Sequence, residues 1–198
     1  IIVCVKRVPA TETRVRFSDG ATVIDPEGVK YIVSPYDEFA LEGAFRTTEA
    51  AGEGQVTVIT LGDEDSLETL RAALAAGADA AVLLRVQGSV TMDGLATAKT
   101  LAAELETREE QLVLFGVKAG DDDQQQVGPM VATLLNRPCV PGVASFEVQR
   151  DMAVCHRDVE GGIEVIEVDL PAVLTITKGE SEPLYASLKG TLAAKPMP

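Results

Sequence analysis

Apolar and polar positions follow two repeating patterns through the first two thirds of the chain. Short runs rich in β-branched residues predict buried strands at 1–8, 55–62, 80–86 and 111–117. Between and after them, apolar residues recur at helical spacing and predict helices at 34–52, 63–77, 93–105 and 128–138. Because strands that alternate with helices form right-handed βαβ units, the pattern predicts a parallel sheet.

The pattern changes near residue 143. Four extended runs follow, at 143–150, 152–159, 162–169 and 172–177. They are interpreted as an antiparallel addition, and an earlier hairpin is predicted around Asp19 and Gly20. The predicted fold class is α/β, a Rossmann-like parallel sheet with helices on both faces and an antiparallel β addition in the C-terminal third. We expect one α/β domain over 1–178 and an exposed segment over 179–198.

Composition narrows the range of partners. The 198 residues carry a formal net charge of −14, which disfavours nucleic acid and anionic membranes and would suit a basic protein surface. No apolar run reaches the about eighteen residues that a membrane helix needs. The amino end is apolar first and basic second, the reverse of a signal peptide, so a cytoplasmic protein is expected. Three widely spaced cysteines and a single histidine lack zinc-site spacing.

One segment carries most of the candidate chemistry: "GVKAGDDDQQQVGP", residues 116–129. It follows a predicted strand, where ligands of open α/β sheets bind, and it leads into a helix whose first amides can bind a phosphate. Neither a G-x-G-x-x-G nor a P-loop pattern accompanies it. Two other interpretations stay open, namely a Mg²⁺ site at 121–123 and a solvated surface turn.

Four stretches carry a family resemblance: "VCVKRVP", "SPYDEFALEGA", "GVKAGDDDQQQVG" and "RDVEGGIEVIEVDLPAVLT". With them the chain resembles the β subunit of electron transfer flavoprotein from end to end. The resemblance implies an electron carrier without substrate chemistry, paired in a heterodimer with an α subunit that mainly holds FAD at the interface. It also implies that the β subunit binds AMP, or a second FAD in the members that bifurcate electrons.

The resemblance assigns nucleotide contacts by position. These are Cys4, Ser34, Pro35, Tyr36, Asp37, Leu61, Gly116, Val117, Lys118, Ala119, Gly120, Asp121, Asp122, Asp123, Gln124, Gln125, Gln126 and Val127. It places Asp122 near the adenosine and 125–127 near the phosphate. Val127 stands where the AMP-binding pattern has Thr, and "QVGP" is similar to the members with a second FAD, so the nucleotide is AMP or FAD.

The resemblance also predicts a docking element near the end. "YASLKG" looks like the loop with which the family recognises dehydrogenases, which places partner contacts at Tyr185, Ala186, Ser187, Leu188 and Lys189. Family members continue for some tens of residues as an arm around the α subunit, so 179–198 is expected to hold this loop and a truncated arm. The alternatives are a stand-alone adenine-nucleotide sensor of similar fold and a Mg²⁺-dependent phosphoryl enzyme.

Overall fold

The main sheet is parallel and six-stranded. The computed structural model describes residues 1–17, 24–25, 27–86 and 92–179. The strand order across the sheet is β5-β4-β1-β6-β11-β7, and every neighbouring pair is parallel. In that order the strands are Ala80–Arg85, Thr57–Gly62, Ile2–Cys4, Leu112–Gly116, Ala172–Ile176 and Cys139–Val143. The predicted parallel sheet is therefore confirmed.

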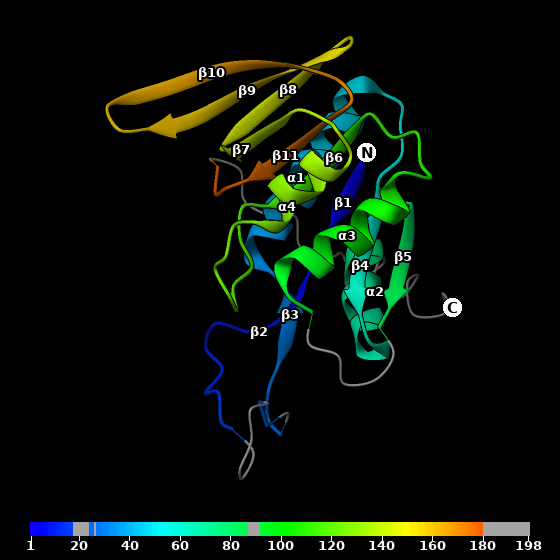
Figure 1. The fold of residues 1–198 in the computed structure, drawn as a ribbon, viewed down its shortest axis with the longest axis vertical. Coiled ribbons are helices and arrows are strands. Elements are labelled where there is room, and N and C mark those ends of the chain that lie inside the picture. Colours follow the sequence, from blue (N-terminus) through cyan, green and yellow to red (C-terminus); the bar gives the residue numbers. More distant parts are fainter. Residues whose placement is uncertain (18–23, 26, 87–91, 180–198) are drawn as a thin grey trace.

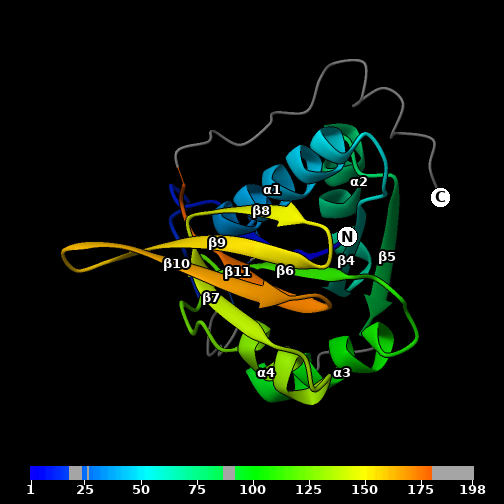
Figure 2. The same cartoon turned by 90° about the horizontal axis from the view of Figure 1, so that it is seen from above.

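Helices cover both faces of this sheet, as predicted. Figure 2 shows α1 and α2 on one side and α3 and α4 on the other. Their bounds are Pro35–Ala51 for α1, Leu67–Ala76 for α2, Gly94–Leu105 for α3 and Val127–Leu134 for α4. A short 3₁₀ turn, η1 at Glu64–Ser66, leads into α2. Ser34 is the N-cap residue of α1, with Pro35 at the first helical position, but the Ser34 side chain makes no capping hydrogen bond.

Two apolar cores lie on the two faces of the sheet. Successive strand residues point to opposite faces, so Val3 packs under α1 while Ile2 packs under α3 and α4. The same alternation separates Leu114 from Val113 on β6. The central strands are therefore buried on both faces, which explains their almost continuous apolar sequences.

A separate three-stranded antiparallel sheet lies beside α1 (Figures 1 and 2). Its strands are β8 at Ser145–Gln149, β9 at Met152–Val159 and β10 at Gly162–Asp169. Gly43 of α1 allows close contact here, because a Cβ at this position would lie 2.9 Å from the Phe146 ring. Three of the four predicted runs are thus confirmed as antiparallel.

The fourth run was assigned wrongly. β11 joins the parallel sheet between β6 and β7, and all five of its residues are buried. The strand β7, Cys139–Val143, was not predicted. It contains Pro141 and Gly142, and such residues in a strand suit the edge position that β7 occupies.

The first predicted strand is also divided. β1 ends at Cys4, and β2 at Arg7–Pro9 leaves the parallel sheet to pair antiparallel with β3 at Tyr31–Val33. A single antiparallel bridge joins Phe17 to Ile24, consistent with the predicted hairpin, although 18–23 lies outside the described residues.

Candidate functional site

A cavity of about 510 Å³ opens at the carboxyl ends of β1, β4 and β6. β1 and β6 are neighbours in the sheet, but the chain runs from β1 through α1 to β4 and from β6 through α4 to the opposite edge. The strand order therefore reverses between them. Ligands of open α/β sheets bind outside such a reversal point. We call this cavity the crevice.

Most of the sequence-predicted site residues line the crevice. They are Cys4, Asp37, Leu61, Gly116, Val117, Lys118, Ala119, Asp122, Gln124, Gln125, Gln126 and Val127. The remaining predicted residues flank it without lining it, and they are Ser34, Pro35, Tyr36, Gly120, Asp121 and Asp123. Ser34 is wholly buried, and its hydroxyl has no hydrogen-bond partner among the described residues.

Sequence reasoning missed one wall of the crevice. It comes from residues before and within α3, which include Val86, Met92, Gly94, Thr97 and Leu101. The signal was available, because α3 follows β5 and so begins at the same carboxyl edge of the sheet. This wall is largely apolar, whereas the loop at 116–127 is polar.

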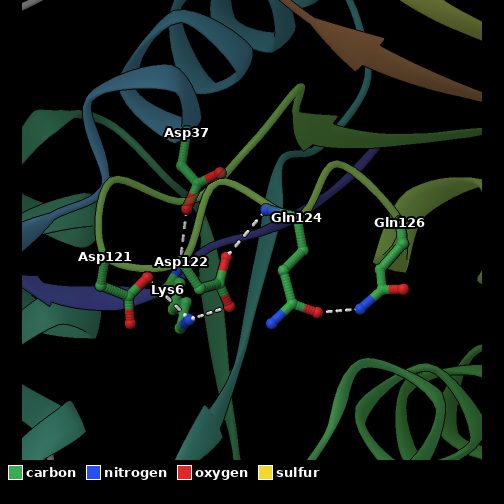
Figure 3. Close-up of polar contacts among 6 residues, drawn as sticks. All are labelled: Lys6, Asp37, Asp121, Asp122, Gln124 and Gln126. Atoms are coloured by element: carbon green, nitrogen blue, oxygen red, sulfur yellow. Dashed lines mark hydrogen bonds and ion pairs between the residues drawn. The ribbon is translucent and has the colours of Figure 1, made fainter.

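The three adjacent aspartates are paired with lysines. Lys6 Nζ lies 2.8 Å from Asp121 Oδ1 and 3.0 Å from Asp122 Oδ2, as Figure 3 shows. Lys118 Nζ lies 2.8 Å from Asp123 Oδ2. Burial alone would lower the pKa of Lys6, but the hydrogen bonds and charges of the two aspartates raise it overall. The like charges are therefore tolerated because each has a cation beside it. No cluster of three or more potential metal-ligating His, Cys, Asp or Glu side chains occurs in the part of the chain that the structure describes.

The backbone of the loop has a defined and unusual shape. Asp123 and Gln125 adopt left-handed φ values of 54° and 55°, which non-glycine residues rarely do. Asp122 Oδ1 accepts the Gln124 amide at 3.3 Å, and the Gln126 side chain donates to Gln124 Oε1 (Figure 3). Such strained positions often cluster at functional sites. The loop leads directly into α4.

The helices α3 and α4 both begin at the crevice. Asp93 caps α3, because its Oδ1 accepts the Ala96 amide at 2.8 Å. At α4 the N-cap residue Gln126 makes no side-chain capping bond. Gly128 lets α4 lie close to the sheet, since a Cβ there would approach Thr175 Cγ2 to 2.7 Å. Pro129 has no amide, so the first amides of α4 are those of Val127 and Gly128, which lack a capping side chain and lie at the wall of the crevice.

Two buried titratable groups, Asp37 and Cys4, lie at the floor of the crevice. Burial raises the pKa of Asp37 to about 7, although the backbone amides of Lys6 and Gly116 donate to it and oppose the shift. Burial, with a further contribution from the Asp37 charge, raises the pKa of the Cys4 thiol well above its usual range. Cys4 is therefore a neutral thiol near pH 7, which argues against nucleophilic chemistry there.

The crevice does not account for the predicted docking loop or for the question of a membrane span. The docking residues 185–189 lie outside the described residues. Among the residues that the structure does describe, no helix is both long enough and apolar enough to span a lipid bilayer.

The fold and the crevice define a class, the doubly wound α/β domains with an antiparallel addition. Within that class, the family model of the electron transfer flavoprotein domain matches residues 21–198. The chain belongs to this family, among its β subunits.

Three relatives illustrate the similarity. The chain is 36% identical to the electron transfer flavoprotein subunit beta of Syntrophomonas wolfei, over all of this chain and 77% of the relative. It is 40% identical to that of Thermoanaerobacterium thermosaccharolyticum, over 98% of this chain and 74% of the relative. It is also 38% identical to the caffeyl-CoA reductase-Etf complex subunit CarD of Acetobacterium woodii, over all of this chain and 76% of the relative.

Proposed function

We propose that this β subunit holds an adenine nucleotide in the crevice and pairs with an α subunit that holds a redox FAD, so that the heterodimer carries electrons. The observation that carries the proposal is the start of α4, whose amides have no side-chain cap and lie at the crevice wall. Free amides and the positive end of the helix dipole make such a terminus suited to a phosphate.

The composition of the crevice suits an adenine nucleotide as a whole. Its volume of about 510 Å³ lies within the usual range for ligand pockets of about 300–1,000 Å³. Lys6 and Lys118 offset most of the charge of the three aspartates of the loop, and the apolar wall from Met92 and Leu101 suits an adenine ring. The two left-handed residues of the loop, Asp123 and Gln125, give its backbone a defined shape directly before α4.

Two nucleotides fit these features, AMP and FAD. A bound AMP would be a structural ligand, whereas a second FAD would supply a further redox flavin. The resemblance of "QVGP" to the family members with a second FAD supports FAD. Val127 supplies no hydroxyl, so a phosphate beside it would depend on the amides of α4.

The docking of dehydrogenases is a further part of the proposal. It rests on the resemblance of 185–189 to the family's recognition loop, with Leu188 as the apolar anchor. We likewise propose 1–178 as the nucleotide-binding domain, 179–198 as loop and arm, and the cytoplasm as the location.

The test is to co-express the chain with its α subunit, purify the heterodimer, denature it and chromatograph the supernatant. We expect AMP or FAD at about one per β subunit, in addition to one FAD from the α subunit. A visible spectrum of the intact heterodimer should show flavin. A purified heterodimer that contains flavin but no second nucleotide would contradict the crevice assignment and leave the electron carrier standing. A chain that never pairs and never contains flavin would contradict both.

A further inference from the structure

The two central strands separate at the floor of the crevice. β1 and β6 pair in parallel as far as Cys4 and Phe115, and beyond these residues each chain hydrogen-bonds to its outer neighbour. The Val5 amide donates to Ile59 O at 2.9 Å, and the Val117 amide donates to Ile176 O at 2.7 Å. A gap without ladder hydrogen bonds therefore opens between the ends of β1 and β6.

Asp37 fills this gap with hydrogen bonds. Its Oδ2 accepts the Lys6 amide at 2.7 Å, and its Oδ1 accepts the Gly116 amide at 2.9 Å (Figure 3 shows the first of these). Asp37 lies in the first turn of α1 and is 6% exposed. Buried amides without an acceptor are costly, so one carboxylate satisfies a donor from each strand.

The opposite side of the contact is shaped for this carboxylate. A Cβ at Gly116 would lie 2.4 Å from Asp37 Oδ1 and 2.8 Å from the backbone of Tyr36 and Asp37. Only glycine therefore lets the first turn of α1 approach the end of β6 this closely. Gly116 and Asp37 form a matched pair across 79 residues of sequence.

We propose that Asp37 is the positioning residue of the crevice. Both of its carboxylate oxygens accept backbone amides, so it sets the separation of the ends of β1 and β6 that the nucleotide enters. The inference rests on the proposed nucleotide binding. It gives Asp37 a role beyond the assignment by position, which made it a nucleotide contact.

The ionisation of Asp37 supplies a specific readout. Lys6, Asp121 and Cys4 are the titratable groups that interact with it electrostatically, and burial raises its pKa to about 7. When the carboxyl binds a proton, one oxygen becomes a donor and one amide loses its acceptor. Nucleotide affinity should therefore fall as the pH falls through 7. The effect of pH on folding stability has the opposite direction, because the pKa of Asp37 is higher in the folded state than its ordinary value of 3.8. Protonation of Asp37 therefore stabilises the folded state fully below about pH 3.8, and this contribution is lost as the pH rises through 7.

The binding experiment uses the full chain, AMP as the probe, and titration calorimetry between pH 6 and pH 8. We expect Asp37→Asn to weaken AMP binding about ten-fold at pH 8, because an amide offers one acceptor for two donors. Since AMP titrates near pH 6, the ratio of wild-type to variant affinity is compared at each pH. The ratio should decrease toward pH 6, and a ratio of one at every pH would overturn the proposal.

Amide hydrogen exchange tests the same role without any nucleotide. The amides of Lys6 and Gly116 should exchange faster in Asp37→Asn than in wild type, while the Val117 amide serves as the unchanged reference. If the variant fails to fold, the pH profile of these amides relative to Val117 in wild type gives the same test. If the wild-type protein binds neither AMP nor FAD, the proposed nucleotide binding is wrong, but the exchange experiment still tests the role of Asp37. Unchanged exchange at Lys6 and Gly116 would overturn that positioning role.

Discussion

The starts of α3 and α4 lie at the same crevice but differ in how their first amides are satisfied. A Cβ at Gly94, the first residue of α3, would lie 2.4 Å from the side chain of Gln126, the N-cap residue of α4. At α3 the chain supplies its own anion, the Asp93 carboxylate. At α4 it supplies none, and the neighbouring aspartates at 121–123 pair with lysines instead.

The difference shows how an acidic protein can keep a place for an anion. With a net charge of −14, the general field repels phosphate, so attraction must come from local groups. A capped helix end is closed to a ligand, whereas an uncapped end beside paired aspartates is not. Four substitutions test this contrast, from the largest expected effect to the smallest.

Gln126→Glu makes the start of α4 resemble that of α3 by adding a carboxylate of nearly the same shape. We expect AMP or FAD affinity to fall about ten-fold or more, because like charges at close range repel by about 1 to 4 kcal/mol near a protein surface. The free energy of unfolding should rise slightly, since an acidic group at a helix N-terminus contributes about 0.3–1 kcal/mol. Calorimetric titration and chemical denaturation measure the two effects.

The matched control is Gln149→Glu on β8, outside the crevice lining, which should leave affinity unchanged. Equal losses of affinity in both variants would indicate a general charge effect and not an anion site at α4.

Asp93→Ala removes the cap of α3. The free energy of unfolding should fall by about 1 kcal/mol, as is typical of a lost N-cap, while nucleotide affinity changes less than about two-fold. Asp93→Asn, which keeps an acceptor, should retain most of the stability. If Asp93→Ala weakened binding as strongly as Gln126→Glu, the two helix ends would not differ in function.

Lys6→Met removes the cation shared by Asp121 and Asp122. The Lys6 side chain is 43% exposed, so the free energy of unfolding should change by less than about 1 kcal/mol. AMP affinity should fall about three-fold and depend less on salt, because an unpaired acidic loop repels phosphate. Arg85→Gln breaks an ion pair of similar length with Glu64, outside the crevice lining, and should leave the salt dependence of binding intact.

Val127→Thr adds a hydroxyl at the first residue of α4. If AMP is the ligand, its affinity should rise about three-fold, in line with one further hydrogen bond. The measurement is a competition titration of AMP against FAD in wild type and variant. A fall in AMP affinity would show that Val127 contributes packing and not a missing phosphate contact.

Local sequence patterns were sufficient for the type of most elements and for the crevice loop. The alternation of apolar strands with amphipathic helices predicted the parallel sheet, and the helix predicted at 34–52 matches α1 closely. These features depend on the burial period and on backbone preferences of neighbouring residues, which a single sequence contains. The loop at 116–127 followed because ligands meet the carboxyl ends of parallel strands.

Strand partners were decided by the tertiary structure. β11 was grouped with the antiparallel runs before it, although its continuous burial between β6 and β7 is typical of a central parallel strand. β7 was missed because it contains Pro141 and Gly142, which are rare inside strands and are tolerated at an edge. Extended runs look alike locally, and their neighbours are chosen by contacts between distant segments.

The chemistry of the crevice was likewise determined partly by the sequence and partly by the tertiary structure. Its sequence by itself determined that three aspartates, three glutamines and the start of a helix stand together. Only the tertiary structure brought Lys6 to Asp121 and Asp122, more than a hundred residues away, and Asp37 to the amide of Gly116. The physical reason is that hydrogen bonds and ion pairs act over a few ångströms in space, whereas the pattern of a sequence records only neighbours along the chain.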